Sequence, residues 1–165
     1  MSDRPRSVYA RELVGPVPAG ADPAGLTLRL VEPGDDPALG GLMERAYAET
    51  IDDDLGDNDD GAVEIADWRA TGAAPAASVV ATSPDGAVAS ACLVSRDCDG
   101  TLWISYVITD PSAKGKGVAR AVVTDALRRL HASDPGERVL AGVTDGNTPS
   151  ERLLVRLGFQ RLRAV

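Results

Sequence analysis

The sequence predicts one domain of mixed α and β structure. Short apolar runs separated by turn residues predict strands, and segments with apolar residues three and four positions apart predict helices. A glycine-spaced basic turn at residues 114–117 lies between an apolar strand and an amphipathic helix. At 165 residues the chain is long enough for a sizeable core, and nothing suggests a second domain. We expect residues 26–165 to form this domain and residues 1–25, which are rich in Pro and Gly, to form an extended arm outside it.

A strand and two helices are expected first. Residues 26–31 alternate between apolar and polar side chains, which is typical of a half-buried strand. The turn at residues 33–37 follows and supplies a helix cap. Apolar residues at helical spacing then predict one helix over about 39–50 and a second over 62–71, which ends near Gly72.

Three strands are expected next. Residues 78–83 and 87–96 are joined by a Pro-Asp-Gly turn at residues 84–86, which is typical of a hairpin. After a further turn, residues 101–109 are predicted to form the central strand. Cys92 and Cys98 are six residues apart, about 20 Å along an extended chain, which is too far for a disulfide, and we expect both to be core thiols.

The chain after the basic turn is expected to form a helix, a strand and a second helix. Val118, Val122 and Ala126 recur every four residues and predict an amphipathic helix. Residues 138–144 are predicted to form a strand. Residues 147–159 then carry a helix signature.

This segment contains residues typical of the start and of the end of a helix. Thr148 is the expected N-cap, Pro149 suits the first helical position, and Glu151 completes a capping box with Thr148. Gly158 suits a left-handed stop before a short last strand at residues 159–165.

The basic turn has the chemistry of a phosphate site. A helix N-terminus presents unpaired backbone N–H groups and the positive end of a dipole. Gly115 and Gly117 have no side chain to block a phosphate, and Lys114 and Lys116 add positive charge. The glycine spacing of this turn matches neither the P-loop nor the dinucleotide-binding fingerprint. The fingerprint would need Gly or Ala at the position of Arg120.

The pattern Lys114-x-x-Gly117-x-Ala119 resembles the acetyl-CoA loop of the GNAT superfamily of N-acetyltransferases. The segment from Asn147 to the Gly158-Phe159 pair resembles the last helix of the same family. The resemblance extends over roughly residues 26–165. It implies the GNAT fold, in which helices cover both faces of a central, mixed, mostly antiparallel twisted sheet.

The resemblance also implies a reaction and a binding site. The expected enzyme moves an acetyl group from acetyl-CoA, as co-substrate, to a primary amine of a small molecule or peptide, by direct attack. Main-chain groups of Val107 and Thr109 are expected to pair with the pantetheine arm, and an amide near Val107 to polarise the thioester. The other expected acetyl-CoA contacts come from Lys114, Gly115, Lys116, Gly117, Val118, Ala119, Asn147 and Ser150.

The proton-transfer groups are the least defined part of the expected site. Many relatives carry a Tyr, which protonates the departing CoA, at the position that Leu154 occupies here. Tyr106 is the nearest strand candidate for a catalytic role, although a strand Tyr more often only packs. No Glu lies on the central strand, so the base stays open between Asp97, Asp99, an acidic-loop residue and solvent. The alternative function is a catalytically weak module that binds acyl-CoA as a sensor or assembly partner.

Charge and composition limit the partners. A net charge of −8 argues against nucleic acid, because no basic stripe is present to neutralise a phosphate backbone. No apolar run approaches the length of a membrane span and no signal-peptide core is present, so we expect a cytoplasmic protein without a membrane partner. Either the N-terminal arm or the partner chain of a homodimer is expected to cover an exposed sheet edge.

An acidic run extends from Asp52 to Asp60. The EF-hand pattern fails there, because a Gly at position 6 would put Ile51 or Gly56 at position 1. We therefore expect no metal, and the simplest interpretation is a solvated acidic loop. The alternatives are that its carboxylates attract a cationic amine, or that they dock a basic partner or a metal.

Overall fold

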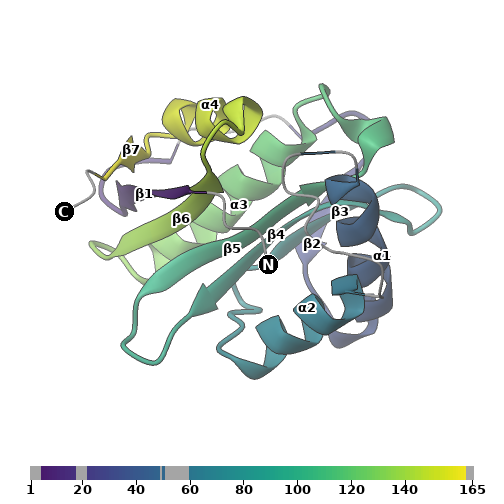
Figure 1. Cartoon of the computed structure of the whole chain (residues 1–165), viewed down its shortest axis with the longest axis horizontal. Coiled ribbons are helices and arrows are strands. Elements are labelled where there is room, and N and C mark those ends of the chain that lie inside the picture. The colour runs from purple at the N-terminus through teal and green to yellow at the C-terminus, as the bar shows by residue number, and fades with distance from the viewer. Residues whose placement is uncertain (1–4, 18–21, 49, 51–59, 163–165) are drawn as a thin grey trace.

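The computed structural model of the protein describes the following parts of the chain (Figure 1): residues 5–17, 22–48, 50 and 60–162. The acidic run lies outside these residues, apart from the backbone of Asp60, so its interpretation stays a prediction. Within the described parts, no helix is long and apolar enough to cross a membrane.

One open sheet organises the described chain. Its strands follow the order β2-β3-β4-β5-β6-β1-β7, and every neighbouring pair is antiparallel except β5 and β6. The expected mixed, mostly antiparallel sheet is therefore confirmed. The strands are β1 (Arg6–Glu12), β2 (Thr27–Leu30), β3 (Val79–Thr82), β4 (Val88–Arg96), β5 (Leu102–Thr109), β6 (Arg138–Thr144) and β7 (Gln160–Arg161).

Helices cover both faces of this sheet (Figure 1). The helices are α1 (Asp36–Tyr47), α2 (Asp60–Ala70), α3 (Val118–Ser133) and α4 (Thr148–Arg156), with short 3-10 helices at Pro33–Asp35 and Pro111–Ala113. Two apolar clusters form the core of the described chain. In one, Leu42 of α1 and Ile65 of α2 pack with Ile108 of β5, and in the other Val122 of α3 and Leu154 of α4 pack on the opposite face.

The first strand shows that the expectation for residues 1–25 was wrong in part. β1 pairs along its whole length with β6 and at two positions with β7, so it lies inside the sheet. Tyr9 is 4% exposed and Leu13 is fully buried. Of the two expected ways to cover the sheet edge, the N-terminal segment is the one observed, because its apolar residues complete the core beside β6.

Two smaller expectations are also corrected. The N-cap of α4 is Asn147 rather than Thr148, and its side chain accepts a hydrogen bond from the Ser150 amide at 3.3 Å. Asn is at least as strong a cap as Thr, and with Asn147 as the cap, Thr148 and Pro149 are the first two residues of the helix. Cys92 is buried, but β4 ends at Arg96, so Cys98 falls in the following turn and is exposed.

Candidate active site

The site is built where two parallel strands separate. β5 pairs with β6 only from Leu102 to Ile104, and the two strands diverge beyond that point. A β-bulge lies at the same level, because the β4–β5 register shifts between Leu93 and Val94. Bulges bend a strand and increase its local twist. The bulge therefore accompanies the opening between β5 and β6.

Main-chain groups of β5 face this opening. The amide of Asp110, directly after β5, donates to the carbonyl of Ala89 in β4 at 2.8 Å. Main-chain groups alternate in direction along a strand, so those of Val107 and Thr109 point away from β4 and toward the space beside β6. These are the two residues expected to pair with a pantetheine arm.

A groove of about 900 Å³ continues from this opening along the start of α3 and one side of α4. Most of the residues expected to bind acetyl-CoA meet there, although they come from separate segments of the chain. The expected residues that line the groove are Val107, Thr109, Lys114, Gly115, Gly117, Val118, Ala119, Asn147 and Ser150. Two expected residues do not line it: Lys116, which is exposed in the loop, and Tyr106, which lines a different pocket.

The loop before α3 leaves a helix N-terminus open to the groove. Gly117 is the N-cap of α3 with a left-handed φ of 77°, and Gly115 has the same φ. A Cβ at either position meets no other atom within 4 Å, so the space above the helix end is clear. Backbone amides of the first turn, together with the helix dipole, make this end of the groove suitable for an anion.

Basic side chains surround the groove in a chain of net charge −8. Lys114 reaches back to α1, where its Nζ donates to the Ala46 carbonyl at 3.4 Å. Arg120, Arg152 and Arg156 also line the groove. These three arginines are not among the residues expected from the sequence. The four-residue spacing of Arg152 and Arg156, which places them on one face of α4, was the signal that could have found that pair.

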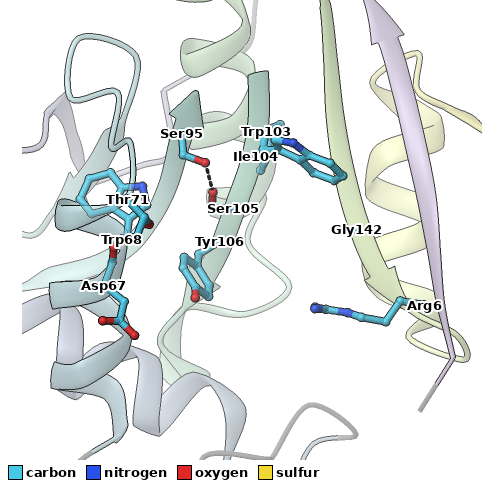
Figure 2. A pocket seen from close by; sticks show the side chains of 10 residues that line it. All are labelled: Arg6, Asp67, Trp68, Thr71, Ser95, Trp103, Ile104, Ser105, Tyr106 and Gly142. Atoms are coloured by element: carbon cyan, nitrogen blue, oxygen red, sulfur yellow. Dashed lines mark hydrogen bonds between the residues drawn. The ribbon is translucent and has the colours of Figure 1, made fainter. Parts of the chain in front are cut away.

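A second pocket, of about 280 Å³, lies on the other side of β5 (Figure 2). Its floor is formed by β4 and β5, one wall by α2, and the other wall by β6 and the start of β1. The lining residues are Arg6, Asp67, Trp68, Thr71, Ser95, Trp103, Ile104, Ser105, Tyr106 and Gly142.

Tyr106 is held at this pocket by a helix. Its hydroxyl donates a hydrogen bond of 2.5 Å to Oε2 of Glu64 on α2. Burial raises the pKa of the Tyr106 phenol, and the hydrogen bond to Glu64 raises it further. The phenol therefore keeps its proton at neutral pH. Glu64 was not predicted as a site residue, because nothing in the sequence indicates its contact with Tyr106, 42 positions away.

The residue at position 154 lies away from both pockets. Leu154 is 3% exposed and packs in the core beneath α4, while its neighbour Leu153 lines the groove. Among the described residues that line the groove, Tyr47 alone carries a phenol. Tyr47 is also close enough to Tyr106 for its charge to influence the pKa of that phenol, so it lies near the boundary of the two pockets.

Comparisons with known proteins agree with this geometry. The model of the acetyltransferase (GNAT) family matches residues 43–159. A mycothiol acetyltransferase of Salinispora tropica is 30% identical over 163 residues, in an alignment that covers 93% of this chain and 51% of that protein. The chain therefore spans about half the length of this relative.

Solved structures show the same fold. A GCN5-related N-acetyltransferase from Sphaerobacter thermophilus superposes with a TM-score of 0.74 at 24% identity, over 95% of this chain and 48% of that one. The aminoglycoside N-acetyltransferase AAC(6')-Iy, solved in complex with CoA, superposes with a TM-score of 0.64 at 20% identity, over 90% of this chain and 95% of that one.

Proposed function

The chain belongs to the GNAT family of acetyltransferases, and we propose that it transfers an acetyl group from acetyl-CoA to the primary amine of a small molecule by direct attack. The observation that carries the proposal is the groove, which joins the open side of β5, the N-terminus of α3 and the Asn147 cap in one continuous surface. A peptide amine is the second class of acceptor that this chemistry admits.

The residues of the groove fit the parts of acetyl-CoA. Pyrophosphate needs amide donors and positive charge, which the first turn of α3 and Lys114 supply. Pantetheine carries amides that need strand-like partners, and the main-chain groups of Val107 and Thr109 offer them. Arg152 and Arg156 supply positive charge for the remaining phosphate on the α4 side. Acetyl-CoA would bring an activated thioester, so no covalent enzyme intermediate is needed.

We assign the acceptor amine to the pocket that contains Tyr106. As the amine nitrogen bonds to the acetyl carbon, its proton passes to the Tyr106 oxygen while the Tyr106 proton passes to Glu64. This relay leaves the phenol neutral throughout, in keeping with its raised pKa, and places the final proton on a carboxylate. Glu64 is thus the proposed base, and Tyr106 the catalytic group that contacts the acceptor.

The departing thiolate needs a proton from another group. Leu154 has no proton to donate and is buried. Tyr47 lines the groove near its boundary with the acceptor pocket, and we assign the proton donation to its hydroxyl. Its proton is then restored from solvent.

Thiol release from acetyl-CoA tests the function. A panel of primary amines is assayed with the wild type and with Gly117→Glu, which places a carboxylate at the N-terminus of α3. We expect release with at least one amine and its loss in the variant. Acetyl-CoA binding without release for any amine would favour the alternative, a module that senses acyl-CoA. A homodimer and a cytoplasmic location stay predictions. Light scattering tests the first, and cell fractionation tests the second.

A further inference from the structure

Two opposite charges line the acceptor pocket. Arg6 enters it from the start of β1, and Asp67 enters it from α2 on the opposite wall (Figure 2). Figure 2 shows Tyr106 between them, with the Arg6 side chain directed toward the phenol. The positive charge of Arg6 acts to lower the pKa of Tyr106, as a nearby cation does, against the larger effects of burial and Glu64.

Neither charge is neutralised by the described part of the protein. The Arg6 guanidinium makes no ion pair or side-chain hydrogen bond with any described residue, and the same holds for the Asp67 carboxylate. By contrast, Arg69, two residues after Asp67, forms an ion pair of 2.8 Å with Asp36. The two charges in the pocket are therefore available to a ligand.

The rest of the pocket limits the size and orientation of such a ligand. Trp103 forms part of the floor, and its Nε1 donates to Asp97 at 3.1 Å, which holds the ring in place. Gly142 contributes no side chain on the β6 wall, so the space of about 280 Å³ stays open toward Arg6. Such a space suits a molecule of roughly amino-acid size.

We propose that the acceptor carries an anionic group together with its amine, as an amino acid does. This inference rests on the proposed acetyltransferase function and names its substrate class. The amine lies on the α2 side, where Asp67 attracts it and where Glu64, three residues earlier on the same helix face, receives its proton through Tyr106. The anionic group faces Arg6, whose planar guanidinium matches a carboxylate or a phosphonate.

The same charges select against other amines. A diamine would place its second positive charge near Arg6, and the two cations would repel each other. An amine without an anionic group would leave Arg6 without an ion-pair partner. Both effects reduce the affinity for ligands of these two kinds. The pocket is therefore expected to discriminate by charge, with the two aromatic side chains of its floor setting the shape.

The experiment compares matched acceptors in the thiol-release assay. The twenty L-amino acids are measured beside their amides, with 1-aminoethylphosphonate and 1,4-diaminobutane as further acceptors. The variants are Arg6→Gln, Arg6→Lys and Asp67→Asn. Arg138→Gln is the control, because Arg138 is an exposed arginine of β6 whose ion pair with Glu12 lies outside both pockets.

We expect kcat/KM for at least one amino acid to exceed that for its amide at least tenfold. Arg6→Gln should narrow this ratio to below threefold, Arg6→Lys should retain most of it, and Asp67→Asn should raise KM for the amino acid. The phosphonate distinguishes the two anionic groups, because a carboxylate site favours alanine over 1-aminoethylphosphonate.

Gly142→Leu tests whether the acceptor binds in this pocket. A Cβ at Gly142 meets no atom within 4 Å, so this position has room for the start of a side chain, and a leucine there should narrow the pocket. We expect a higher acceptor KM and an unchanged Kd for acetyl-CoA.

Three results would overturn the inference. These are equal kcat/KM for acids and amides, a preference for the acid that survives Arg6→Gln, and release with 1,4-diaminobutane but with no zwitterion. In all three the proposed acetyltransferase function would stand. Acetyl-CoA binding with no release for any acceptor would overturn both proposals.

Discussion

The hydroxyl of Tyr106 donates a hydrogen bond of 2.5 Å to Glu64 and so connects the middle of β5 to α2. This contact joins the sheet that forms the floor of the acceptor pocket to the helix that forms its wall. It also places a carboxylate beside Tyr106, the one phenol among the described residues that line that pocket. The proposed relay of the amine proton depends on this pair.

The relay predicts non-additive kinetics. Tyr106→Phe and Glu64→Gln should each lower kcat by about 10²-fold, because general base catalysis contributes effects of that size. The double variant should be no slower than the slower single variant, since both substitutions break one proton path. The measurement is kcat for the three variants at saturating acetyl-CoA. A double variant whose loss equals the product of the two single losses would show that the residues act independently.

The raised pKa of Tyr106 predicts a loss of stability in alkali. The folded state holds the phenol proton more tightly than the unfolded chain, whose phenol has a pKa of about 10. Above pH 10 the unfolded state therefore binds fewer protons than the folded state, and the free energy of unfolding falls as pH rises. Because the ring is only half-buried, the effect should be at most about 1 kcal/mol. Urea unfolding at pH 8 and pH 11 measures it, and Tyr106→Phe should show the smaller fall. Equal falls in the two proteins would contradict the assignment.

The arginines of α4 should contribute to acetyl-CoA affinity. Arg152→Gln and Arg156→Gln should each weaken binding by about threefold to tenfold at low salt, because each removes an exposed positive charge from the proposed phosphate site. The loss should shrink as salt is added. Arg129→Gln is the matched control, since Arg129 pairs with Asp125 at 3.1 Å on α3 and does not line the groove. A loss in the control as large as at Arg152 would indicate a general charge effect.

The position of β1 predicts that the N-terminal segment stabilises the domain. Leu13 is fully buried, whereas the next residue, Val14, is 63% exposed. Leu13→Ala should lower the free energy of unfolding by about 2–5 kcal/mol, because it leaves a cavity in the core. Val14→Ala should change it by about 0.5 kcal/mol or less. Two equally small effects, measured by urea unfolding, would place this segment outside the cooperative core.

The basic loop and the last helix were readable from the sequence because their signals are local. The spacing of Lys114, Gly117 and Ala119 and the run from Asn147 to Gly158 each lie within a few turns of chain. Helical periodicity likewise indicated α1 and α3. Such signals depend only on residues close together in the sequence, so they can be recognised without knowledge of the fold.

The missed features depend on contacts between distant segments. The composition around β1 predicts an arm rather than a strand, and the partner strand β6 lies more than a hundred residues away. Glu64 reaches Tyr106, and Arg6 comes to face Asp67, only after the sheet has formed. No local pattern in the sequence indicates that these side chains lie together.

Acetyl-CoA binding, measured by calorimetry, tests the central claim most directly. Gly117 and Gly136 both have left-handed φ angles, 77° and 83°, and a Cβ at either meets no atom within 4 Å. Gly117→Glu and Gly136→Glu therefore introduce similar backbone strain, about 1–2 kcal/mol each, but only the first places a carboxylate in the groove. We predict that the wild type and Gly136→Glu bind acetyl-CoA and that Gly117→Glu does not. Equal binding by both variants, or no binding by the wild type, would contradict the assignment of the groove to acetyl-CoA.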